Sequence, residues 1–158
     1  MLLESSSGQS FSLIVDRYEF PDEELGPTED NPADEFDPGR FLVITVSVKT
    51  PAGSWQATAP EMTTTELERL AAWLSSVSDG LPSGRGAYFT ERDLEFSVDE
   101  AITSISIHLV RDFLPPWEQR SSCTITFPLD CIDLSQAVSE IRSQIRQFPH
   151  RPRPDRSA

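Results

Sequence analysis

Apolar and polar residues alternate along several short stretches of this chain, which is the period-two pattern of β-strands with one buried face. The clearest case is residues 41–49, where one face carries Leu42, Ile44, Val46 and Val48. Similar alternation or a short apolar run marks six further stretches: 11–20, 54–59, 87–90, 94–98, 104–109 and 123–129. The turn residues Pro51-Ala52-Gly53 predict that 41–49 and 54–59 pair as antiparallel neighbours.

Two other stretches have the spacing of amphipathic helices. The first begins with a capping box, either Thr63 with Glu66 or Thr65 with Glu68, in which each side chain satisfies a free backbone N–H group. Its end is predicted at Asp79-Gly80. Its apolar stripe consists of Leu67, Leu70, Ala71, Leu74 and Val77.

The second predicted helix begins near Asp133, which has Gln136 three positions on, and ends at Pro149. Its single apolar stripe consists of Leu134, Val138, Ile141, Ile145 and Phe148. Strands followed by a helix, then further strands and a helix, predict an α+β fold. We expect a mainly antiparallel sheet with the two amphipathic helices packed against it.

A chain of 158 residues fits one domain. We expect a flexible N-terminus over residues 1–10 and a single α+β domain over residues 11–149. Residues 150–158 are rich in Arg and Pro and predict a disordered tail.

The chain has 26 acidic and 13 basic residues, giving a net charge of -13. Proteins that bind nucleic acid neutralise phosphates with Lys and Arg, so this charge excludes nucleic acid and, equally, anionic membrane surfaces as partners. No apolar run approaches the roughly 20 residues that cross a bilayer. The first residues also lack the basic start and apolar stretch of a signal peptide. We therefore expect a cytoplasmic protein; its oligomeric state is not indicated.

Between residues 22 and 37 the chain has eight carboxylates and no basic residue, among prolines and glycines that predict a loop. This acidic segment can be a solvated connection, a contact surface for a basic protein partner, or a weak cation site. As candidate partner-binding residues we take its eight acidic positions: Asp22, Glu23, Glu24, Glu29, Asp30, Asp34, Glu35 and Asp37.

Phe113 and Trp117 are two further candidate partner-binding residues, because they flank Leu114-Pro115-Pro116. An aromatic side chain after two prolines can form a rigid exposed anchor, and Trp is frequent at binding hot spots. The alternative is that both side chains pack in the core, which is the commoner role of aromatic residues.

The sequence contains no catalytic constellation, cofactor motif or metal-ligand spacing. Nucleophilic catalysis by Ser or Cys needs a positioned base. The two histidines are His108, in a predicted strand, and His150, in the predicted tail. We expect Cys123 and Cys131 to be reduced, structural thiols. We therefore expect no enzymatic activity, no metal and no cofactor.

A series of short motifs runs in order through residues 11–149. It includes Tyr18-Glu19-Phe20-Pro21, Gly53-Ser54-Trp55, Ala72-Trp73-Leu74, Leu94-Glu95-Phe96, Pro115-Pro116-Trp117 and Phe127-Pro128-Leu129. Together these motifs resemble the WapI-type immunity proteins, a bacterial family associated with contact-dependent toxins. The chain departs from the family pattern at Arg40-Phe41 and at Ala59-Pro60-Glu61. The resemblance implies binding to a toxin but supplies no motif for the contact residues.

The leading hypothesis is a non-enzymatic, cytoplasmic immunity-like protein that binds and neutralises a cognate bacterial toxin. Many antibacterial toxins attack nucleic acid and are basic, so an acidic inhibitor gains fast, steered association. The alternative is an acidic protein-binding adaptor or chaperone module with no toxin partner. A toxin gene next to this gene favours the first hypothesis, and neighbouring secretion or metabolic genes favour the second.

Overall fold

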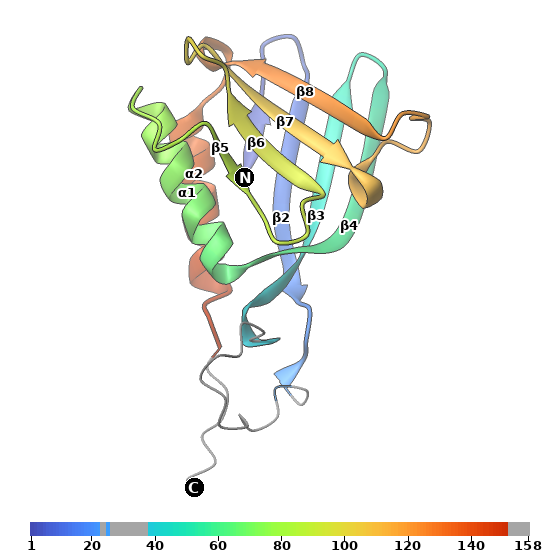
Figure 1. The fold of residues 1–158 in the computed structure, drawn as a ribbon, viewed down its shortest axis with the longest axis vertical. Helices are drawn as coiled ribbons and strands as arrows, with labels where there is room; N and C mark the ends of the chain where they lie inside the picture. The colour runs from blue at the N-terminus through green and yellow to red at the C-terminus, as the bar shows by residue number, and fades with distance from the viewer. Residues whose placement is uncertain (23–24, 26–37, 152–158) are drawn as a thin grey trace, which may run out of the picture.

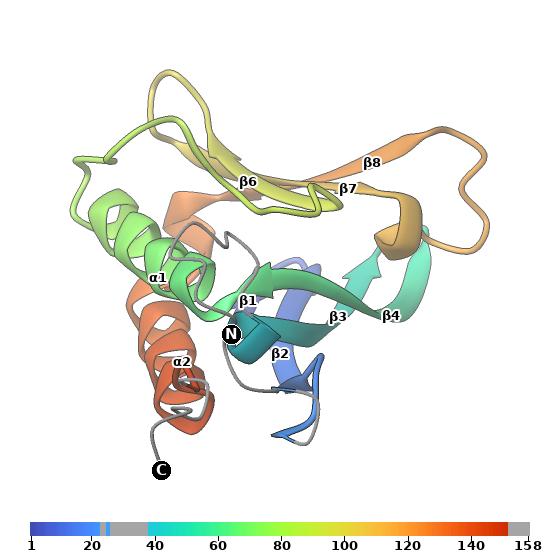
Figure 2. The ribbon, with the colours of Figure 1, turned by 60° about the horizontal axis from the view of Figure 1, so that its bottom comes forward.

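Eight strands form two four-stranded antiparallel sheets that face each other, and two helices lie side by side along one flank (Figures 1 and 2). The computed structural model describes residues 1–22, 25 and 38–151. The sheet orders are β1-β2-β3-β4 and β5-β6-β7-β8, so within each sheet the strands pair in sequence order. The predicted α+β class is confirmed, and the strands divide between two sheets rather than forming one.

The elements of the first sheet are β1 (Leu2–Glu4), β2 (Ser10–Tyr18), β3 (Phe41–Thr50) and β4 (Gly53–Thr63). Those of the second sheet are β5 (Gly86–Tyr88), β6 (Leu94–Val98), β7 (Ser104–Val110) and β8 (Ser122–Pro128). The helices are α1 (Thr64–Ser78) and α2 (Leu134–Gln147). The described residues also include the short 3-10 turns η2 (Pro38–Arg40), η3 (Arg111–Phe113) and η4 (Leu129–Cys131).

The inward faces of the two sheets share one apolar core, because alternate residues of every strand point into the space between them. Phe11 of β2 meets Phe96 of β6 edge to face, with ring centroids 5.7 Å apart. This contact joins the two sheets directly. The apolar face predicted for β3 is fully buried in this core: Leu42, Ile44, Val46 and Val48.

Both helices begin where the sequence predicts. Thr63 caps α1, since its hydroxyl accepts a hydrogen bond from the Glu66 N–H (3.2 Å) and its own N–H donates to the Glu66 carboxylate (2.8 Å). Asp133 caps α2 and accepts from the Gln136 N–H (2.9 Å). Within the residues that the structure describes, no helix is long and apolar enough to span a membrane.

The two ends of the chain differ from expectation. The prediction that residues 1–10 are flexible is wrong for residues 2–4. These residues form β1, which pairs antiparallel with β2 and buries Leu3. Three residues are too few for the alternating pattern to be recognised in the sequence. At the other end, Arg151 contacts the folded domain, whereas residues 152–158 of the predicted tail lie outside the described residues.

Gln144, on the buried face of α2, continues the hydrogen bonding of the first sheet where β1 ends. Its side-chain amide accepts from the Val15 N–H (2.6 Å) and donates to the Leu13 carbonyl oxygen (3.2 Å). An amide side chain offers the same donor and acceptor as a peptide group, so Gln144 takes the place of a strand residue. These two bonds fix α2 against the edge of β2.

Gln144→Leu is expected to lower the free energy of unfolding by about 1–3 kcal/mol, although Leu is the more apolar residue. The loss follows because the buried Val15 N–H loses its acceptor. The Leu13 carbonyl loses one of two donors and keeps the Met1 nitrogen at 2.8 Å. Urea denaturation followed by circular dichroism measures the loss of stability. The matched control is Gln147→Leu at an exposed position of the same helix, which should stay within about 0.5 kcal/mol of the parent. Equal or greater stability of the Gln144 variant contradicts the strand-replacement role.

Candidate functional site

The structure describes one of the eight carboxylates proposed as partner contacts. Asp22 lies just beyond β2, its side chain is 80% exposed, and it forms an ion pair with Arg151. The remaining seven proposed positions lie outside the described residues: Glu23, Glu24, Glu29, Asp30, Asp34, Glu35 and Asp37.

Arg151 ties together the two described flanks of the acidic segment. Its guanidinium donates to the Phe20 carbonyl oxygen (2.6 Å), and its backbone N–H donates to the Gly39 carbonyl oxygen (3.4 Å). The guanidinium also lies over the Tyr18 ring, 3.6 Å from the centroid, a favourable cation–π contact. The chain therefore enters and leaves the acidic segment at points held by one basic residue, whose side chain is only 17% exposed.

The two aromatic candidates at the Pro-Pro-Trp loop, Phe113 and Trp117, differ in exposure. Phe113 is fully buried in the core, so a partner contact through its side chain is ruled out for this structure, and that expectation is corrected. Trp117 is 46% exposed and packs edge to face on Trp55, with ring centroids 5.6 Å apart. A Cβ at Gly53 would lie 2.8 Å from the Trp117 ring, so the β3–β4 turn needs glycine there. Trp117 is thus an exposed aromatic side chain on a fixed support.

Glu61 is a buried carboxylate that sequence reasoning did not single out. A register shift between β3 and β4 leaves it as the extra residue of a β-bulge, and it is 1% exposed. Its Oε1 accepts hydrogen bonds from the backbone N–H groups of Asp93 (3.2 Å), which precedes β6, and Leu94 (3.0 Å), which begins it. Glu61 therefore links the first sheet to the second.

Burial raises the pKa of Glu61 to about 8. The two backbone hydrogen bonds oppose this shift, and the neighbouring negative charges of Asp93 and Glu91 add to it. Among the described residues, Oε2 of this carboxylate has no hydrogen-bond partner. A buried group of this kind ionises reluctantly, so Glu61 holds a proton over much of the range in which other carboxylates are charged.

Asp93 also pairs with Arg111, which in turn donates to the Glu91 carbonyl oxygen. Arg111 has a φ of 44°, a left-handed conformation that is uncommon for a non-glycine residue. The ion pair joins the start of β6 to the end of β7. The Glu61–Asp93–Arg111 cluster is therefore best explained as a link between strand ends.

The histidine and thiol candidates are dispersed. His108 lies on the outer face of β7, with Nδ1 3.1 Å from the Thr124 hydroxyl. Both cysteines are free, and burial raises the pKa of Cys123, while a hydrogen bond with Asp130 raises that of Cys131. Over residues 1–22, 25 and 38–151, no three His, Cys, Asp or Glu side chains gather as metal ligands do.

Sequence reasoning missed two residues at these sites, and only one of them has a signal in the sequence. Glu61 stands between Pro60 and Met62 at the end of a strand pattern, where a charge is out of place. Arg151 is one of three Arg residues in the predicted tail and has no pattern to distinguish it. Its contacts with Tyr18 and Asp22 depend on the fold bringing the two ends of the domain together.

Glu61→Gln is expected to remove a pH dependence of stability. The folded pKa of Glu61 lies above its ordinary value of 4.5, so the contribution of the protonated form is complete below about pH 4.5 and is lost as the pH rises through 8. Gln keeps the acceptor oxygen and does not ionise. Between pH 5 and pH 8 the free energy of unfolding of the variant should therefore rise by about 2–3 kcal/mol relative to the parent.

Urea denaturation at several pH values in this range tests the Glu61 prediction. The control is Glu68→Gln, which removes an exposed carboxylate from α1 and should give a constant difference from the parent. If the difference in free energy of unfolding between Glu61→Gln and the parent does not change with pH, this carboxylate ionises normally.

A family model described as the immunity protein WapI-like family matches residues 1–149 of the chain. The matched range includes both sheets and both helices. No curated protein and no solved structure matches the chain. The match agrees with the resemblance drawn from the short motifs and extends over nearly all of the domain. The chain therefore belongs to the WapI-like immunity protein family.

Proposed function

We propose that this protein is a cytoplasmic, non-enzymatic immunity protein that binds a cognate bacterial toxin directly and thereby neutralises it. The observation that carries the proposal is the family match over residues 1–149. An inhibitor of this kind works by occupying a surface that the toxin needs, so a stable folded domain with a complementary surface is sufficient.

The partner that best suits the charge of this protein is a basic toxin domain. A net charge of -13 attracts a basic protein and accelerates its encounter, while local contacts set the rate at which the complex dissociates. The same charge opposes contacts with nucleic acid and with anionic membranes, so we include neither among the partners.

The proposed contact surface consists of the acidic segment and Trp117. Arg151 holds both described flanks of the segment, which places its ends at fixed positions. Trp117 is supported by Trp55, so it loses little conformational freedom when a partner covers it. Rigid support of this kind favours binding because less entropy is lost on association.

Cells that produce the toxin domain encoded next to this gene are expected to survive only when they also produce this protein. Binding should block the toxin and give a single complex of the two chains on size exclusion with light scattering. Viable counts after induction measure protection. A toxin domain from an unrelated gene pair is the control and should kill equally with and without this protein.

The mass of the toxin recovered from protected cells separates binding from enzymatic inactivation. An unchanged intact mass is expected. A covalently altered toxin contradicts the non-enzymatic part of the proposal, and undiminished killing with two separate elution peaks contradicts the proposal as a whole.

Neutralising part of the acidic segment should slow association with this toxin domain. In a variant with Glu29 and Glu35 changed to Gln and Asp30 and Asp34 changed to Asn, the association rate constant at low ionic strength should fall about tenfold. Its dependence on salt should also weaken, because fewer charges steer the encounter.

The matched control removes four carboxylates elsewhere on the surface: Glu4, Glu68, Glu95 and Asp112. Stopped-flow or biolayer measurements give both rate constants. If the two variants behave alike, only the net charge matters, and the acidic segment is a solvated connection rather than a contact.

A further inference from the structure

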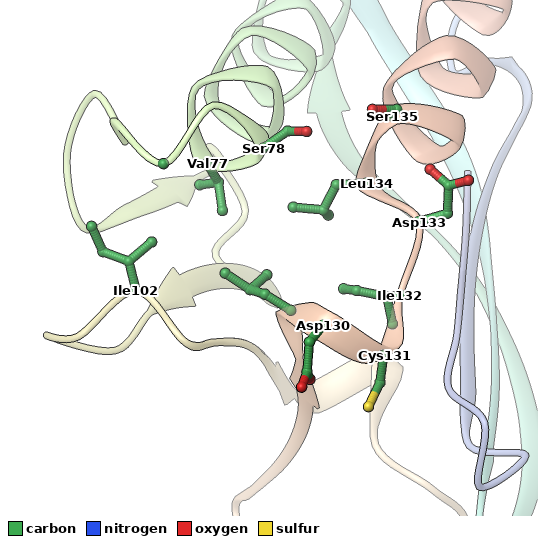
Figure 3. A pocket seen from close by; sticks show the side chains of 11 residues that line it. Val77, Ser78, Ile102, Asp130, Cys131, Ile132, Asp133, Leu134 and Ser135 are labelled. Carbon is green, nitrogen blue, oxygen red and sulfur yellow. The ribbon is translucent and has the colours of Figure 1, made fainter.

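A groove lies where the end of α1, the start of α2 and the turn between β6 and β7 come together (Figure 3). It consists of two adjoining cavities of about 540 and 410 Å³, and Gly80 and Ile102 line both of them. In Figure 1 this end of the domain is at the top, whereas η2, which follows the acidic segment, is at the bottom. The groove is therefore separate from the acidic segment's described flanks.

Apolar side chains form the floor of the groove. Val77, Ile132 and Leu134 point toward its centre, whereas the Cys131 side chain points away (Figure 3). Leu81, at the second cavity, is 79% exposed, the most exposed of the large apolar side chains described. Val77 and Leu134 are only 3% and 7% exposed, so the apolar surface open to a partner is mainly that of Leu81 and of the half-buried Ile102 and Ile132. Burial of this surface under a partner is favourable.

Ile102 has a backbone conformation that is unfavourable for its residue type. Its φ of 54° lies in the left-handed region, where Asn and Gly are favoured and β-branched residues are rare. The turn is held by Asp99, whose carboxylate accepts from the N–H groups of Thr103 and Ser104, both at 2.7 Å. Ile102 is only half-buried and is not part of the apolar core. Folding alone therefore favours a different residue here, and an apolar contact outside the fold explains isoleucine.

Four carboxylates line the two cavities: Asp99, Glu100, Asp130 and Asp133. Asp79 lies in the chain between Ser78 and Gly80, which both line the first cavity. Among the described residues that line the two cavities, Arg85 alone is basic. Asp79 also caps the C-terminal end of α1, where the helix dipole places partial negative charge and a basic residue is stabilising. The last turn of α1 has no basic residue. Side chains and helix end thus produce a negative potential at the same place.

We propose that this groove binds a cationic segment of the toxin, with an apolar side chain seated against Ile102 and Lys or Arg residues beside it facing the carboxylates. This proposal rests on the proposed function, because the ligand of the groove is a segment of the toxin. The groove would contact the toxin at the end of the domain remote from η2. Ile102 lines the groove and Asp79 stands between two residues that line it, and one kind of ligand accounts for both of these residues, which folding disfavours. A second copy of this chain is the poorer occupant, since both copies have a net charge of -13.

Two single substitutions test the groove, and each replaces a residue that the fold disfavours. Ile102→Asn relieves the backbone conformation, and Asp79→Asn removes a charge that opposes the helix dipole. Both variants should unfold at the same temperature as the parent or higher. Isothermal titration with the toxin domain encoded next to the gene should nevertheless show a dissociation constant at least about tenfold larger for Ile102→Asn. For Asp79→Asn we expect an association rate about two- to fivefold lower at low salt.

The matched controls are Ile14→Thr, which removes an exposed isoleucine from the outer face of β2, and Asp112→Asn in η3. Both should bind the toxin domain as the parent does. A variant that loses affinity because it is less stable is recognised by its lower unfolding temperature, which the proposal does not expect for either groove variant.

The possible outcomes separate the two proposals. If the parent forms no complex with the toxin domain, the proposed function fails and the groove proposal fails with it. If a complex forms and both groove variants bind like the parent, the groove proposal alone is overturned. If Ile102→Asn instead converts a self-associated protein to monomer without changing toxin affinity, a second copy occupies the groove and the proposal is again overturned.

A cross-linking experiment identifies the occupant's chemistry. Cys131 lines the groove with its sulfur pointing away from the centre, so a benzophenone-maleimide attached there reaches the rim (Figure 3). The variant Cys123→Ser leaves Cys131 as the one thiol of the chain. After irradiation of the complex, the cross-linked toxin peptide should contain Lys or Arg next to a large apolar residue. A predominantly acidic peptide contradicts the proposal.

Discussion

The packing of two sheets face to face is the constraint on which the rest of this structure depends. Each four-stranded sheet has one apolar face, and neither face can remain in water, so the sheets bury each other around contacts such as that of Phe11 with Phe96. The helices close one flank of the space between them (Figure 2). With the interior filled by side chains, groups available to a partner are confined to the outer faces and to the ends where the connections meet.

The two ends of the domain differ in how far their negative charge is compensated. At one end, Arg151 partly compensates the negative charge and holds Asp22 and the described flank at Gly39. At the other, the carboxylates around Ile102 have little compensation, and the end of α1 adds to their field. Inside the domain, Glu61 avoids the cost of a buried charge by holding its proton. Net charge alone does not describe this distribution, which depends on where the fold places each group.

The sequence predicts best those features that depend on neighbouring residues. The capping pairs at Thr63 and Asp133 are local, and the structure has both helices starting there. The alternation in β3 is equally local, and its buried face is the predicted one. The division into two sheets is not local, since it depends on β4 leading into α1 instead of pairing with β5. Gln144 is not part of the apolar stripe predicted for this helix, and only the position of β2 explains why a polar residue is buried there.

The candidate sites depend even more on contacts between distant parts of the chain, so the sequence predicts them less well than the fold. Phe113 and Trp117 are four positions apart in one loop, yet one is in the core and the other is half-exposed, and no pattern in the loop distinguishes them. The groove combines three connections that are far apart in the chain, so composition could not indicate it. The acidic segment was evident from composition, because its meaning depends on charge density and not on geometry.

The pairing of Gln144 with β2 has a consequence for how the protein is made. Val15 and Gln144 are 129 positions apart, so at typical rates of translation roughly 10 s pass between the emergence of β2 from the ribosome and that of its amide partner. During this interval the edge of β2 beyond β1 lacks this amide partner, and an unpaired strand edge is a template for association with other nascent chains. Helix α2 thus completes the first sheet, and the finished domain forms only after Gln144 has left the ribosome.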